Sequence, residues 1–99
     1  MDTKRVIQDK NALALRQVLM DVRDALTELD LDSCDIDDVR EVIEKAESEL
    51  DRSSPSVDAV GIYLNSIARS LRAQPNVRTV VMELDAAMHA ANVVTNWEH

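Results

Sequence analysis

Carboxylates are the residues of this sequence most able to do chemistry, and they gather in one stretch. Residues 30–51 contain ten Asp and Glu against two basic residues, and they account for the whole formal net charge of −8. The flanking segments, 1–29 and 52–99, each balance their own charges. Acidity concentrated in this way argues against nucleic acid as a ligand and favours a partner with a basic surface.

The start of this acidic stretch matches a calcium-binding EF-hand loop only in part. Counted from Asp30, the ligand positions 3, 9 and 12 are acidic, as calcium coordination requires. Position 5, however, is Cys34, whose sulfur is a poor ligand for a hard cation, and position 6 is Asp35 where the loop needs glycine. We therefore expect an acid-rich linker before a helix, and no metal site.

Catalysis would need convergent polar groups, and the sequence offers few. The histidines are His89 and the terminal His99, and we interpret His89 with Asp85, four residues earlier, as a solvent-exposed ion pair. We expect the acidic neighbours of Cys34 to raise the pKa of its thiol and make it a poor nucleophile, with only the nearby helix N-terminus acting in the opposite direction. Gly61 is the only glycine, which excludes a glycine-rich phosphate loop. We expect no enzymatic activity and no cofactor.

Four amphipathic segments would position these residues. Hydrophobic residues recur three and four positions apart over about 3–29, 36–51, 55–73 and 76–97, which predicts four helices. One glycine, two prolines and no phenylalanine leave few of the residues that a multi-stranded sheet needs. The sequence predicts one all-α domain over residues 1–99, either a small four-helix bundle or two packed helical hairpins with short loops.

Capping residues suggest where these helices begin and end. Asp35 is a good N-cap for the second helix, and the acids after it suit the positive end of the helix dipole. Ser54 is the expected N-cap of the third helix, with Pro55 at its first position. Pro75 disfavours helical geometry in the residue before it, so we expect the third helix to end there. Gly61 then lies inside that helix, where it would allow close approach of a neighbouring helix or weaken its own.

Acidic side chains follow one another along the second expected helix at spacings of three and four residues. We interpret them as a recognition face for an arginine- and lysine-rich partner surface. The alternative is a solvated face that keeps the protein soluble. The candidate partner-binding residues are Asp37, Asp38, Glu41, Glu44, Glu47 and Asp51.

The third and fourth expected helices carry more apolar residues than one bundle face can absorb. Such a helix is either central in the bundle or shared with another chain. We expect a homodimer, since symmetric dimers are the commonest oligomers; the alternative is that the helix over 76–97 is the buried centre of a monomer. The candidate self-association residues are Ile62, Tyr63, Met82, Val93 and Trp97.

The residues around the third turn are weakly basic, with Arg69, Arg72 and Arg78 close together. Arginines at a helix C-terminus complement the helix dipole, and an acidic protein lacks the wide basic field of a DNA reader, so we expect no direct nucleic-acid binding. A membrane span needs roughly 18 apolar residues in a row, which no segment reaches, and no secretory signal is evident. The single cysteine excludes an internal disulfide and fits a reducing compartment. We therefore expect a cytoplasmic protein without a membrane span.

Together these patterns favour a non-enzymatic protein-binding module of the inhibitor, adaptor, chaperone or immunity type, which uses an acidic helix face to bind a basic partner surface. The alternative function is a nucleic-acid mimic, such as a phage or mobile-element anti-defence protein, that presents carboxylates where a basic groove expects phosphates. One helix supplies a single row of charges, whereas duplex DNA has two. A homodimer would supply the second row.

Overall fold

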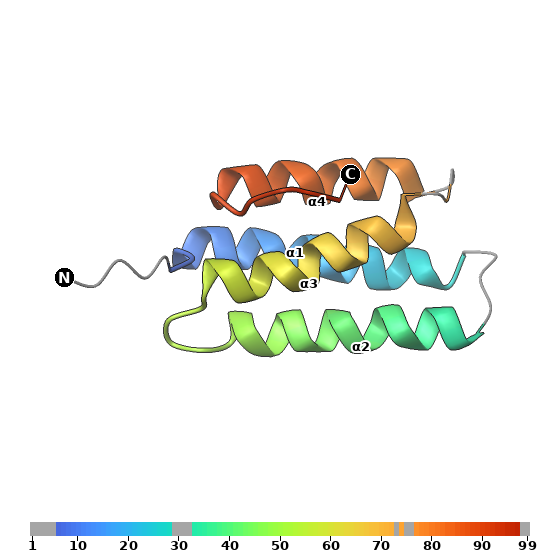
Figure 1. Cartoon of the computed structure of the whole chain (residues 1–99), viewed down its shortest axis with the longest axis horizontal. Helices are drawn as coiled ribbons and strands as arrows, with labels where there is room; N and C mark the ends of the chain where they lie inside the picture. The colour runs from blue at the N-terminus through green and yellow to red at the C-terminus, as the bar shows by residue number, and fades with distance from the viewer. Residues whose placement is uncertain (1–5, 29–32, 73, 75–76, 98–99) are drawn as a thin grey trace.

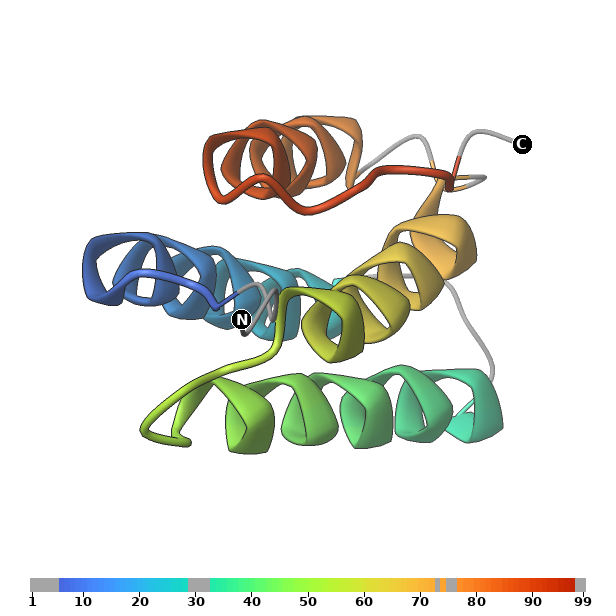
Figure 2. The same cartoon turned by 60° about the vertical axis from the view of Figure 1, so that its left-hand side comes forward.

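The chain folds as four helices, and the all-α prediction is confirmed (Figure 1). A computed structural model describes residues 6–28, 33–72, 74 and 77–97, and of Ser33 and Cys34 only the backbone. The helices are α1 (Asp9–Leu26), α2 (Ser33–Leu50), α3 (Val57–Leu71) and α4 (Arg78–Ala90), and the described residues contain no strand. Figure 2 shows α4 and α2 on opposite sides of the molecule, with α1 and α3 between them. Because α2 and α4 each pack against both α1 and α3, the architecture is a four-helix bundle.

The core consists of the apolar stripes that the sequence predicts. In α2 the residues Val39, Ile43, Ala46 and Leu50 are all buried, while Ile36 at the start of the stripe is only partly so. Each fully buried Leu or Ile contributes about 1.5–3 kcal/mol relative to an exposed one. The largest fully buried side chains come from α1, α2, α3 and α4 and from the residue before α4: Leu15, Leu19, Val22, Leu26, Ile43, Val60, Leu64, Ile67, Leu71, Val77, Leu84 and Met88.

The predicted first helix is too long at both ends. Residues 1–5 and Leu29 lie outside the described residues, but Val6 forms an isolated antiparallel bridge with Ser56, and the Ile7 amide donates to the Pro55 carbonyl oxygen at 3.0 Å. Ile7 is buried in this arrangement. Its burial against the segment before α3 replaces a further turn of helix, and α1 begins at Asp9 and ends at Leu26.

The second and third helices also differ from their predicted starts. The helix α2 already begins at Ser33, so Asp35 lies in its first turn and is not its N-cap. The N-cap of α3 is Ser56, not Ser54: its Oγ accepts a hydrogen bond from the Ala59 amide at 3.3 Å. Ser54 and Ser56 both lie just before α3 and offer the same capping chemistry, so tertiary contacts decide which of them caps the helix.

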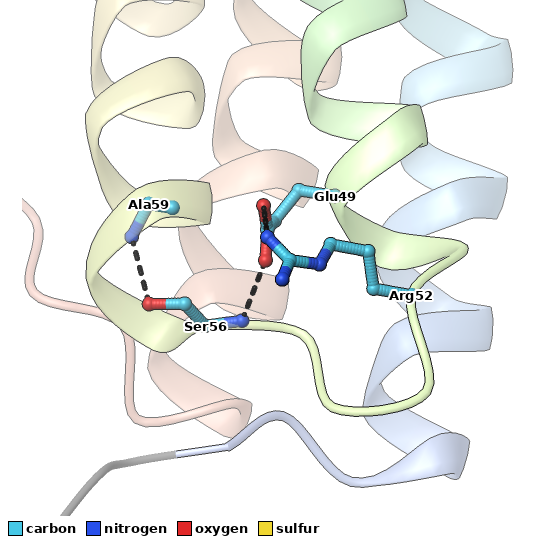
Figure 3. A network of polar contacts seen from close by, with 4 residues as sticks. All are labelled: Glu49, Arg52, Ser56 and Ala59. Carbon is cyan, nitrogen blue, oxygen red and sulfur yellow. Dashed lines mark hydrogen bonds and ion pairs between the residues drawn. The ribbon is translucent and has the colours of Figure 1, made fainter.

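One carboxylate fixes the turn between α2 and α3. Figure 3 shows the Glu49 side chain accepting a hydrogen bond from the Ser56 amide at 3.0 Å and contacting Arg52 Nη1 at 3.4 Å. Ser56 in turn caps α3 through Ala59. The Ser56 amide thereby joins the end of α2 to the beginning of α3, whose first turn the Ser56 side chain caps.

The predicted fourth helix, 76–97, is wrong at its C-terminal end, because α4 ends at Ala90. Asn92 adopts a left-handed conformation with φ of 61°, the Val93 amide donates to the Met88 carbonyl oxygen at 2.8 Å, and the Asn92 amide donates to that of His89 at 3.1 Å. This pair of hydrogen bonds is a Schellman cap, in which asparagine can take the place of glycine. Residues 93–97 then run back between α4 and α3 (Figure 2).

Candidate functional site

The acidic residues of α2 do not form one straight row. An α-helix turns by about 100° per residue, so each spacing of three falls about 60° short of a full turn. The three steps from Asp38 to Glu47 therefore carry the acids about 180° around α2. Asp38 lies at the α3 side, where it lines a hollow with Ser66 and Ser70, and Glu47 lies at the α1 side.

The acids on the α1 side bind arginines of the neighbouring helix. Glu47 accepts two hydrogen bonds from the Arg23 guanidinium, at 2.6 and 3.3 Å, and Asp51 forms an ion pair with Arg16. A planar guanidinium suits such two-point binding of a carboxylate. These two acids of the predicted site join α1 to α2, and their charges are neutralised within the chain.

Five of the predicted acids are exposed, and one of them, Asp51, is paired with Arg16. We call the other four the acidic face: Asp37, Asp38, Glu41 and Glu44. Lys45 Nζ lies 3.8 Å from Glu41 Oε1, a weak contact between exposed groups. Within the described ranges, Asp37, Asp38 and Glu44 have no ion-pair partner within 4.0 Å. The acidic face thus keeps most of its negative charge available to another molecule.

An open hollow of about 360 Å³ lies beside the acidic face, where α2 meets α3. Glu41, Glu44 and Lys45 line it from α2, and Tyr63 lines it from α3. Tyr63 is half-buried, so one part of its side chain packs on the bundle while another part borders the carboxylates. A carboxylate pair beside an aromatic ring is an arrangement that an arginine or lysine side chain can contact by charge and by cation–π attraction.

The predicted self-association residues lie on α3, on α4 and in the C-terminal segment, and they differ in exposure. Ile62 and Met82 are exposed, at 69% and 63%, but Ile62 lies on α3 beside the C-terminal segment and Met82 lies on α4. Tyr63 borders the acidic face. Val93 is 3% exposed and Trp97 is half-buried, so within one chain Val93 is covered and offers no exposed surface.

Sequence reasoning missed the residues that hold the C-terminal segment. Asn65 is 5% exposed, its Nδ2 donates to the carbonyl oxygens of Gly61 and Val94 at 2.8 Å each, and its Oδ1 accepts from the Asn96 amide at 2.7 Å. The signal in the sequence is an amide residue on the apolar face of α3, next to Leu64. A buried amide needs partners, and here the returning chain provides two of the three.

Two of the three arginines near the α3–α4 turn also hold this segment. Arg69 donates to Asn96 Oδ1 at 3.1 Å, and Arg72 donates to the Trp97 carbonyl oxygen at 2.6 Å. The sequence-based interpretation, that these arginines complement the dipole of the third helix, is therefore incomplete. Arg78 lies at the first position of α4 and is exposed.

The candidate catalytic and metal-binding residues form no reactive cluster in the described part of the chain. His89 Nε2 lies 3.4 Å from Asp85 Oδ2, and Asp85 Oδ1 also accepts a hydrogen bond from Trp97 Nε1 at 3.1 Å, so this carboxylate has a structural role. No group of three or more possible metal ligands occurs among the described residues. Asp30, Asp32 at the third position of the partial EF-hand match, His99 and the side chain of Cys34 lie outside the described residues.

Among the described residues, no helix combines the length and the hydropathy that crossing a membrane requires. The candidate functional side chains among the described residues are of two kinds, the exposed carboxylates of α2 and the polar residues that hold the C-terminal segment. Comparisons of the chain with models of protein families, with curated proteins and with solved structures found no match.

Proposed function

We propose that the chain works as a protein-binding module, whose acidic face on α2 docks on a basic surface of its partner. The observation that carries this proposal is that the fold pairs some acids of α2 and its C-terminal end with arginines and, among the described residues, leaves others unpaired. Glu47 and Asp51 are neutralised by arginines of α1, whereas Asp37, Asp38 and Glu44 keep their charges exposed without an ion pair in the described structure.

The size of the acidic face favours a protein partner over the alternative of nucleic-acid mimicry. From Asp37 to Glu44 the helix advances roughly 10 Å, at 1.5 Å per residue. Duplex DNA carries about six phosphates over that distance, on two strands, whereas the acidic face carries four carboxylates with Arg40 and Lys45 among them. A patch of this size matches a small cluster of Lys and Arg side chains better than a groove that holds duplex DNA.

Charge reversal on the acidic face tests the proposal. The double variant E41K/E44K changes the charge by four units, and D24K/E83K makes the same change at exposed positions of α1 and α4. Each form, immobilised, is used to capture proteins from a native lysate for identification by mass spectrometry. We expect a partner retained by the wild-type chain and by D24K/E83K to be lost with E41K/E44K, because association of charged surfaces depends on local complementarity.

The same capture separates the two functions. Retention of one specific partner that handles no nucleic acid supports the protein-binding module, and retention mainly of nucleic-acid-binding proteins supports mimicry. If E41K/E44K and the wild-type chain retain the same proteins equally, the acidic face serves solubility and the proposal is wrong.

A further inference from the structure

The C-terminal segment 93–97, which we call the tail, is held against α3 by hydrogen bonds, as a bound peptide would be. Asn65 donates to the Val94 carbonyl oxygen and accepts from the Asn96 amide, at 2.8 and 2.7 Å. Both partners are main-chain groups two residues apart, so these hydrogen bonds hold an extended backbone whatever its side chains. Main-chain hydrogen bonds of this kind provide affinity in extended-peptide recognition, while pockets for alternate side chains provide specificity.

Two side chains of the tail supply that specificity. Val93 is buried, and its Cγ1 would lie only 3.2 Å from a Cβ atom at Gly61, so the missing side chain of Gly61 makes room for it. Trp97 donates its Nε1 hydrogen to Asp85 Oδ1 at 3.1 Å. We call the groups that hold the tail the tail seat, which consists of Gly61, Asn65, Arg69, Arg72 and Asp85.

The joint between α4 and the tail is a single residue in an uncommon conformation. Asn92 has φ of 61°, whereas the α4 residues before it are helical up to Ala90. A change of the backbone angles at this one position would redirect the tail and leave the hydrogen bonds of α4 in place. The tail is thus a short unit with its own binding site, and such units open more readily than a bundle core.

We propose that the tail seat is an exchangeable site, and that a second copy of the chain fills it by reciprocal exchange of tails about Asn92. The occupant follows from the contacts, because the tail of another copy offers the same valine, backbone and indole groups to the same seat. Ile62 and Val94, 69% and 64% exposed, line a hollow beside the seat. Two chains that meet at this point would cover these side chains, which the closed monomer leaves in water. This proposal is independent of the acidic face.

The joint provides the first test. N92P fixes φ near −65° and removes the amide that donates to the His89 carbonyl oxygen, so the tail cannot return to its own seat. N92G is the matched control, because glycine adopts positive φ without strain. In sedimentation equilibrium we expect N92P to have about twice the mass of the monomer. At the same concentrations, N92G should have the same mass as the wild-type chain. Addition of N65A to N92P should return the mass to that of the monomer.

A second test does not depend on the folding of N92P. The full-length chain with W97A retains the seat and weakens its own tail, and it contains no other tryptophan. A synthetic peptide of residues 91–97 therefore carries the only indole in the mixture, and its fluorescence anisotropy reports binding. We expect saturable binding of the peptide to the W97A chain. The added substitution N65A should weaken this binding about tenfold or more, because it removes the hydrogen bonds of Asn65 to the Val94 carbonyl oxygen and to the Asn96 amide of the peptide.

Three results would overturn the proposal. A monomeric N92P that keeps the helical circular dichroism of the wild-type chain would show that a released tail does not enter a second copy. A dimer of N92P that survives N65A would place the contact elsewhere. Absence of peptide binding to the W97A chain up to about 1 mM, the effective concentration that a tethered segment commonly has, would show that the seat accepts the tail only within its own chain.

Discussion

Gly61 shows how a single missing side chain shapes this molecule. The sequence left open whether Gly61 allows a close approach or weakens its helix, and the structure shows an approach by the side chain of Val93, from the tail and not from a helix. A Cβ atom at this position would lie 3.2 Å from Val93 Cγ1, which is tighter than ordinary van der Waals contact. The substitution G61A therefore combines a gain in helix propensity with a steric cost at the tail.

A double-mutant cycle separates these two effects. Gly to Ala in a helix interior gains up to about 1 kcal/mol, and V93A removes the atom that a Cβ at residue 61 would crowd. We expect G61A to increase the free energy of unfolding by about 0.5–1 kcal/mol in the V93A background and by clearly less in the wild-type chain, as measured by urea denaturation. Equal gains in both backgrounds would show that the Val93 side chain moves away from a Cβ atom at residue 61 without a loss of free energy.

Asn65 illustrates why a buried polar residue cannot be assigned from sequence alone. Its position on the apolar face of α3 predicts burial, but its partners, Val94 and Asn96, are about thirty residues away. Nothing in the helical spacing of residues 76–97 distinguishes a continuing helix from one that stops at Ala90 and turns back. The Schellman cap and the amide of Asn65 decide that together.

At the scale of elements, the turn between α2 and α3 depends on which serine caps α3. Ser56 accepts from the Ala59 amide, and its own amide donates to Glu49, whereas Ser54 lies two residues before the cap and is exposed. The choice follows from Ile7, whose amide binds the Pro55 carbonyl oxygen and thereby holds Pro55 in the segment before the helix.

The two serines provide a matched pair of variants. Loss of an N-cap side chain costs about 1 kcal/mol, so S56A should lower the free energy of unfolding by about that amount. S54A should change it by less than about 0.5 kcal/mol, as is usual for exposed positions. Chemical denaturation followed by circular dichroism measures both. A larger effect for S54A than for S56A would contradict the cap that the structure shows.

At the scale of the whole molecule, the bundle divides the acids of α2, and Asp51 directly after it, among three environments. Glu47 and Asp51 bind α1, Glu49 binds the start of α3, and the acidic face points into solvent. Charge reversals of similar residues on the same helix should therefore have different consequences. This separates the role of an acid in stability from its role in recognition.

Reversal of Glu47 should destabilise the fold, and reversal of two residues of the acidic face should not. E47K replaces the partner of Arg23 by a second cation, with an expected loss of about 1 kcal/mol or more in the free energy of unfolding. E41K/E44K should change it by less than about 0.5 kcal/mol, although it alters more charge. Urea denaturation at low salt measures both, and R23E combined with E47K should recover part of the loss. Equal stability of E47K and the wild-type chain would show that the α1–α2 ion pair is immaterial.

The fold class, the four helices and most of the core could be predicted from the sequence, because helical periodicity is a local property of neighbouring residues. The sequence also located the acidic stretch, since charge is counted residue by residue. Tertiary structure alone decided which acids remain exposed, because an i, i+3 series rotates around its helix and meets α3, solvent and α1 in turn. Tertiary structure also decided that residues 91–97 leave the helix and pack against α3 and α4, because their partners Asn65, Arg72 and Asp85 lie far from them in the sequence. Contacts between distant residues depend on packing, and no spacing within one segment encodes them.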